Sequence, residues 1–82
     1  MRFPRLSGKV TITDEEGTIM ISGDPEGLRA LGTLLTWLAD QDLDTWPHLR
    51  EGQQAHLHVY PRIDLSEASR EVELIRMDVK RG

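Results

Sequence analysis

The sequence predicts an α+β domain in which one amphipathic helix covers one face of a four-stranded, mostly antiparallel sheet, in the order β-β-α-β-β. Three observations predict this fold class. Four short segments alternate between apolar and polar residues, as strands with one buried face do. One longer segment carries leucines at helical spacing, and glycine, proline and acidic residues separate the elements. At 82 residues the chain is expected to form a single domain, residues 1–82.

The first two strands are expected at residues 9–13 and 18–22, where β-branched residues alternate with polar ones. The short polar connection between them ends in Gly17, which accepts the left-handed backbone of a tight hairpin turn. We therefore expect these two segments to pair with each other as antiparallel strands.

The helix is expected to begin after Asp24 and to run to Asp40. The Asp24 carboxylate is placed to accept hydrogen bonds from the free N–H groups of the first turn, and Pro25 suits the first helical position. Gly32 lies near the edge of the apolar stripe, where we expect the helix backbone to approach a strand closely. Five leucines form the stripe that should pack on the sheet: Leu28, Leu31, Leu34, Leu35 and Leu38.

The second half of the chain contains one irregular segment and two further strands. The irregular segment, residues 41–54, carries three apolar side chains that should anchor it to the core: Leu43, Trp46 and Leu49. The third strand is expected at residues 55–60, where the alternation ends at a proline. The fourth is expected at residues 71–79, with a β-bulge between Leu74 and Ile75 because the apolar parity changes there.

The alternation also assigns each strand residue to one face of the expected sheet. The face under the helix should hold Val10, Ile12, Ile19, Ile21, Ala55, Leu57, Val59, Val72 and Leu74. The open face should hold Thr11, Met20, His56, His58, Tyr60 and Glu73, together with either Ile75 or Met77.

The amino-acid composition of the chain excludes several classes of protein and of site. The chain has no cysteine, which excludes disulfides and thiolate metal sites and favours a reducing compartment. Ten basic residues against fourteen acidic ones give a net charge of −4, which argues against a nucleic-acid partner. No apolar run suits a signal peptide at the start or a membrane span later, so we expect a cytoplasmic protein without a membrane partner.

The sequence shows no pattern that carries catalysis. No serine lies in a nucleophile-elbow motif, and no pair of carboxylates has the apolar flanks that raise a pKa. His56 and His58 project from the same face of one strand and could hold zinc together with a third ligand such as His48 or Glu73. Neither of these lies at a spacing that is recognisable as a zinc motif, so the signal for a metal site is weak. We therefore expect no enzyme activity, no catalytic residue, no metal and no cofactor.

Three motifs in this order resemble a known family: Gly23-Asp24-Pro25-Glu26-Gly27-Leu28 opening the helix, His56-Leu57-His58, and Ser69-Arg70-Glu71-Val72-Glu73-Leu74. The chain, over residues 9–79, is similar to the small bacterial immunity proteins of polymorphic-toxin systems, in particular immunity protein family thirty-two. The resemblance implies a non-enzymatic protein that binds a cognate toxin and neutralises it by occlusion. Residues 41–54 depart from the family pattern.

The open sheet face is the expected partner-binding surface, because aromatic and imidazole side chains there suit anchors within a polar surround. It carries His56, His58 and Tyr60, bordered by Trp46 and His48. The alternative is a self-associating accessory or regulatory domain of a bacterial operon, in which a homodimer forms through the same face. Its apolar contribution would come from Met20, Ile75 and Met77.

Overall fold

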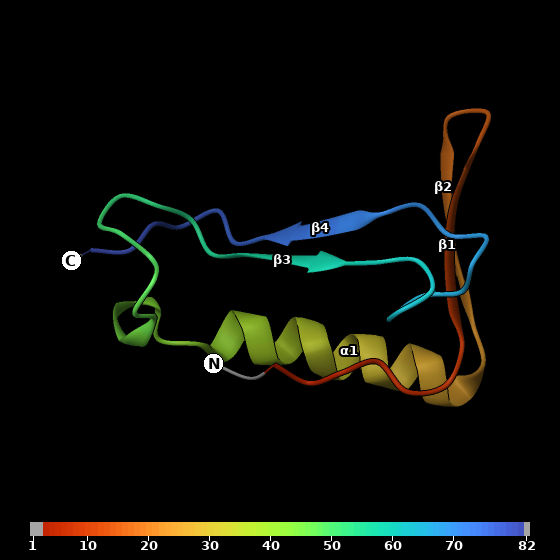
Figure 1. Ribbon diagram of the computed structural model, residues 1–82, viewed down its shortest axis with the longest axis horizontal. Coiled ribbons are helices and arrows are strands. Elements are labelled where there is room, and N and C mark those ends of the chain that lie inside the picture. The colour runs from red at the N-terminus through yellow and green to blue at the C-terminus, as the bar shows by residue number, and fades with distance from the viewer. Residues whose placement is uncertain (1–2, 82) are drawn as a thin grey trace.

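The computed structural model describes residues 3–81, so residues 1, 2 and 82 of the expected domain lie outside it. The described chain is α+β, as predicted (Figure 1). Its elements in order are β1 (Val10–Glu15), β2 (Thr18–Gly23), α1 (Pro25–Asp40), a 3₁₀ turn (Leu43–Thr45), β3 (His56–Val59) and β4 (Val72–Ile75).

The expected single four-stranded sheet is wrong. Among residues 3–81 the strands form two separate antiparallel pairs, β1 with β2 and β3 with β4. In Figure 1 the β3–β4 pair runs alongside the helix, whereas the β1–β2 hairpin stands across that direction at one end. The connection before β4 explains the division, because it takes the outer edge of β1. The Ser66 N–H donates to the Val10 carbonyl at 2.8 Å, and the Arg70 N–H donates to the Ile12 carbonyl at 2.8 Å.

The first hairpin is confirmed, with its turn at Glu16 and Gly17, whose φ values are +49° and +83°. Positive φ at both positions is the geometry of the tight turn that matches strand twist. Burial differs sharply between its strands, since Ile12 of β1 is 8% exposed whereas its cross-strand partner Ile21 is 55% exposed. The assignment of Ile19 and Ile21 to a covered face is therefore wrong, because both side chains line an open groove beside the helix and β4 instead of a packed core.

The core lies between α1 and the inner faces of β1 and β3. Its buried members are Val10, Ile12, Leu34, Leu38, Leu43, Ala55, Leu57, Val59 and Leu65. The leucine stripe is only partly covered: Leu34 is 1% exposed, but Leu28 and Leu35 are about half exposed. The helix thus keeps an apolar edge outside the core.

The helix start is built as expected, but the glycine that allows close approach is Gly27 rather than Gly32. The Asp24 carboxylate accepts from the Gly27 N–H at 2.7 Å and from the Lys9 N–H at 3.1 Å. These bonds, the Lys9 one foremost, lower the pKa of Asp24 below its usual value. A Cβ on Gly27 would lie 2.1 Å from the Lys9 carbonyl oxygen, whereas one on Gly32 would meet nothing within 4 Å.

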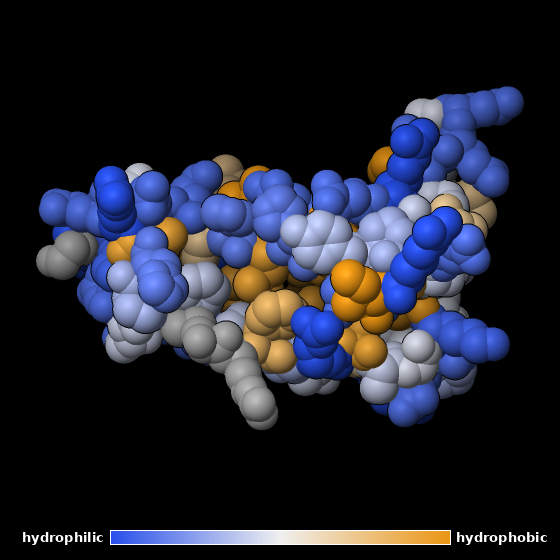
Figure 2. Space-filling view, viewed as in Figure 1, coloured by the Kyte–Doolittle hydropathy of each residue, from blue (hydrophilic) through white to orange (hydrophobic). Residues whose placement is uncertain are grey.

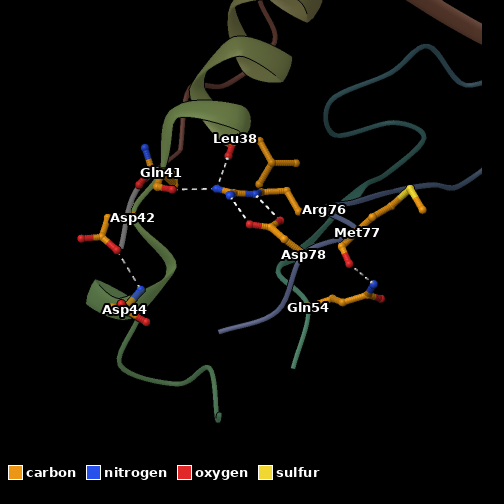
Figure 3. A network of polar contacts seen from close by, with 8 residues as sticks. All are labelled: Leu38, Gln41, Asp42, Asp44, Gln54, Arg76, Met77 and Asp78. Carbon is orange, nitrogen blue, oxygen red and sulfur yellow. Dashed lines mark hydrogen bonds and ion pairs between the residues drawn. The ribbon is translucent and has the colours of Figure 1, made fainter. Parts of the chain in front are cut away.

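Residues 41–54 are anchored to the core as expected, through buried Leu43 and half-buried Trp46 and Leu49. A second anchor comes from the end of the chain. The Arg76 guanidinium donates to the carbonyls of Leu38 and Gln41 at 3.2 and 2.6 Å (Figure 3). These are carbonyls at the open end of the helix, which a cation stabilises.

The second strand pair is shorter than predicted and has no bulge at Leu74 and Ile75. Leu57 pairs with Leu74 and His56 with Ile75 in regular register, and β4 ends there. Ile75 is half exposed on the outer face, so its apolar character does not reflect a change of parity. It was this exposed isoleucine that suggested the bulge.

Candidate functional site

The predicted partner-binding residues on β3 lie in contact with one another. We call His56, His58 and Tyr60 the β3 row. The ring centroids of His56 and His58 are 5.4 Å apart in an edge-on arrangement, and those of His58 and Tyr60 are 5.8 Å apart and stacked. Tyr60 lies one residue beyond the end of β3. The row is held in place because the side chains between its members, Leu57 and Val59, are buried.

His58 also faces an acidic residue across the strand pair. It is the register partner of Glu73, and its Nε2 lies 3.8 Å from a Glu73 carboxylate oxygen. Its Nδ1 is enclosed and makes no hydrogen bond within residues 3–81. The His58 imidazole and the Glu73 carboxylate therefore lie side by side on this face.

Trp46 and His48 lie beside the row at its His56 end. Together with His56 they line a hollow of about 280 Å³, which we call the tryptophan hollow. Trp46 also stacks at a tilt on Trp37, with ring centroids 6.1 Å apart. The structure therefore joins all five predicted residues into one strip, from the tryptophan hollow along β3 to Tyr60. Phe3, Trp37, Pro47, Leu49 and Leu57 complete the lining of the hollow.

Sequence reasoning missed a second surface, on the side of the molecule where the two strand pairs meet. An apolar groove of about 330 Å³ lies there, which we call the β2 groove. Its apolar lining comes from every strand and from the helix: Ile12, Ile19, Ile21, Leu31, Leu35, Val59, Val72 and Leu74. Figure 2 shows apolar residues gathered between the helix and the strands, with polar residues around them.

The signal that could have found this groove is in β2 itself. Ile19-Met20-Ile21 places apolar side chains on both faces of one strand, whereas a strand with one buried face alternates them with polar residues. All three side chains are well exposed, with Ile19 at 63%. Contiguous exposed apolar residues on a small protein mark sites of interaction.

Charged residues border the groove unevenly. Its lining contains two acidic residues, Asp14 and Glu71, and one basic residue, Arg70. Glu15 and Glu16 follow Asp14 at the exposed tip of the hairpin. The rim nearest the hairpin tip is therefore acidic.

Between residues 3 and 81, no three histidine or acidic side chains gather in a way that would hold a metal ion. In the same range no helix combines the length and the apolar character needed to cross a membrane.

Comparison with known families places the chain. A family model described as Immunity protein 32 matches residues 18–76, which is well over half of the sequence. The chain belongs to the immunity protein 32 family. The resemblance inferred from the sequence motifs is thus confirmed. No curated protein and no solved structure matches it.

The part of this immunity protein that matches its family contains most of both candidate surfaces. It runs from the first residue of β2 to the residue after β4, and so includes the β3 row and most of the lining of both the tryptophan hollow and the β2 groove. β1 lies before the matched range. Family membership indicates immunity against a toxin.

Proposed function

We propose that this immunity protein binds a cognate protein toxin and neutralises it by occluding the toxin's functional surface, and that it catalyses no reaction of its own. Family membership supports the immunity role. The observation that carries the binding mechanism is the amount of apolar side chain left exposed on so small a chain, including Ile19, Ile21, Leu28 and Leu35. Such surface is costly in water unless a partner covers it.

Two carboxylates have shifted pKa values, and in both the shift is explained by a structural contact. The pKa values of Asp24 and Asp78 are lowered, the first by the backbone N–H groups of Lys9 and Gly27 and the second by the Arg76 guanidinium. A catalytic carboxyl usually has its pKa raised toward neutrality so that it can exchange a proton. Both carboxylates instead have structural partners, one at the start of the helix and one beside its end.

Within this proposal, the β3 row and the tryptophan hollow form a contact surface for the toxin. Tyrosine, tryptophan and histidine present large rigid faces that lose little conformational entropy on binding, and such residues dominate the energetics of interfaces. The stacking of His58 on Tyr60 already fixes both rings before a partner arrives. The partner would be the toxin of a bacterial polymorphic-toxin system, encountered in the cytoplasm.

The test uses the toxin domain encoded in the neighbouring reading frame, with calorimetry for affinity and an assay of the toxin's own activity. We expect a one-to-one complex in which toxin activity is lost. His58→Ala and Tyr60→Ala should each weaken binding by about tenfold, the usual effect of truncating an aromatic anchor. Thr33→Ala is the control, since Thr33 is exposed on the helix and lines neither the tryptophan hollow nor the β2 groove.

Two results would contradict the proposal. The first is a toxin that binds the protein stoichiometrically and stays fully active, because occlusion would then not be the mechanism. The second is no binding at micromolar concentrations of both proteins. If the complex forms but His58→Ala and Tyr60→Ala bind like Thr33→Ala, the immunity function stands and the β3 row is not the contact.

A further inference from the structure

We infer that the toxin adds a strand to the outer edge of β2 and places apolar side chains of that strand in the β2 groove. The inference rests on the proposed function and specifies where and how the partner is held. It differs from the β3 row in both surface and chemistry, because it relies on main-chain hydrogen bonds and apolar burial.

The hydrogen-bond pattern of the hairpin shows which backbone groups of β2 are free. In an antiparallel ladder, cross-strand pairs alternate between those that bond each other and those whose N–H and C=O groups point outward. Ile12 belongs to the second kind, because its carbonyl accepts from the Arg70 N–H outside the hairpin. The backbone N–H and C=O groups of its partner Ile21 must therefore also point outward from the hairpin, and so must those of Ile19, two residues before it.

One edge of the hairpin is therefore hydrogen-bonded to another segment, and the other edge is not. Residues 66–70 occupy the outer edge of β1 through Val10 and Ile12. Along β2, within the described range 3–81, the sheet ends without a further strand. An exposed edge with unpaired N–H and C=O groups is a template for another strand.

The side chains next to this edge favour an apolar strand. Ile19 and Ile21 lie on the groove side of β2, because Ile21 pairs with the core residue Ile12. Leu31 and Leu35 of the helix and Val72 and Leu74 of β4 complete the groove beside them. Since alternate side chains of an added strand point to one face, every second residue of the incoming strand would enter this apolar space.

Charge decides between a second copy of this chain and a different partner. A two-fold pairing of β2 with β2 of another copy would be antiparallel, so the ends of the strand would exchange places. Glu15 and Glu16 of one copy would then lie near Asp24 and Glu26 of the other, at both ends of the interface. Like charges facing each other across strands destabilise the pairing.

The acidic residues at both ends of β2 favour a partner strand that carries basic residues at its own ends. β2 has no charged residue between Thr18 and Gly23, whereas acidic residues flank it on both sides. A strand with an apolar centre and lysine or arginine at its ends would match this pattern. We therefore assign the groove to such a strand of the toxin.

Hydrogen exchange followed by NMR on the full chain, alone and bound to the toxin domain from the neighbouring frame, tests the main-chain bonds directly. The amides of Ile19 and Ile21 should exchange fast in the free protein and at least about tenfold more slowly in the complex. The amides of Thr18 and Met20, which face β1, should be protected in both states. Unchanged exchange at Ile19 and Ile21 in a formed complex would overturn the inference.

A matched pair of variants tests the groove. Ile21→Lys should weaken toxin binding by about tenfold or more, whereas Met20→Lys should change it by less than about threefold. Both add one positive charge to the same strand, but Met20 lies on the face turned away from the groove. Both residues are exposed, so both variants should fold, which circular dichroism would verify. Equal effects of the two variants would overturn the assignment of the groove.

The remaining outcomes separate this inference from the function on which it rests. If the complex forms and His58→Ala weakens it while Ile21→Lys does not, the immunity function stands and strand addition at β2 is wrong. If light scattering shows a dimer of the free protein with Ile19 and Ile21 protected, a second copy occupies the edge and the inference is also wrong. If no toxin binding occurs, the proposed function fails and this inference fails with it.

Discussion

The two strand pairs of this protein differ in how much of each is covered by the rest of the chain. In the β1–β2 hairpin, the first part of β1 is buried or half-buried by elements outside the hairpin, whereas β2 is exposed along most of its length. In the β3–β4 pair, residues facing the core are covered or half covered on both strands. The difference shows that alternation predicts a strand, whereas other parts of the chain decide whether its apolar face is covered.

The largest expected effect comes from changing the same residue type on the two strands of the hairpin. Ile12→Ala should lower the free energy of unfolding by about 2–4 kcal/mol, because it removes buried methyl groups and leaves a cavity. Ile21→Ala, at the cross-strand partner, should cost less than about 1 kcal/mol because water already reaches that side chain. Urea denaturation measures both. Similar losses would mean that β2 is covered in solution.

A second pair of variants tests what positions β1 against the helix. Gly27→Ala should destabilise the protein by about 1–3 kcal/mol, because the new Cβ would collide with the Lys9 carbonyl just before β1. Gly32→Ala lies in open space and should stabilise by about 0.5–1 kcal/mol through helix propensity. Thermal unfolding of both variants provides the comparison. A stabilising Gly27→Ala would show that the helix start is not held against β1.

The smallest effect concerns Asp24, whose carboxylate joins the helix start to Lys9. Because its pKa is lowered in the folded protein, the stability that it contributes is fully present above its unfolded pKa, about 4, and is lost as pH falls through the folded value. Asp24→Asn should therefore be less stable than the wild type at neutral pH, with the difference shrinking below about pH 4. Melting temperatures between pH 2 and 7 measure this.

Asp40→Asn is the control for Asp24→Asn, because Asp40 is at the opposite end of the helix. A negative charge there is unfavourable to the helix dipole, so its removal should leave stability unchanged or slightly raised at neutral pH. A difference between Asp24→Asn and the wild type that persists at pH 2 would show that the carboxylate charge is not what the cap uses.

Local signals predicted the local structure well. The first hairpin and the helix from Pro25 to Asp40 follow from turn residues, an N-cap and leucine spacing, all of which act within a few residues. The contacts within the β3 row also follow from period-two alternation, although Tyr60 lies beyond the strand. Whether the row binds a partner stays a prediction.

The division of the sheet was not predictable in the same way. It depends on Ser66 and Arg70 reaching back to β1 from a connection whose sequence has no periodicity. Ser69 completes this contact by accepting the Ile12 N–H at 2.9 Å. Bonds between residues more than fifty positions apart leave no pattern in either segment. The β2 groove is lined by both strand pairs and by the helix, so the apolar run Ile19-Met20-Ile21 was a local sign of an exposed surface but could not show what lies beside it.

The bonds from Arg76 to the helix end have a consequence for the order of assembly. The helix is made early in the chain, but the guanidinium that occupies its last carbonyls comes from a residue 35 to 38 positions later. A nascent chain shorter than this carries a helix whose final turn is open to water and prone to fraying. The helix end therefore gains its full stability only after synthesis has passed Arg76, and a protease that cuts before that residue would loosen a helix it never touches.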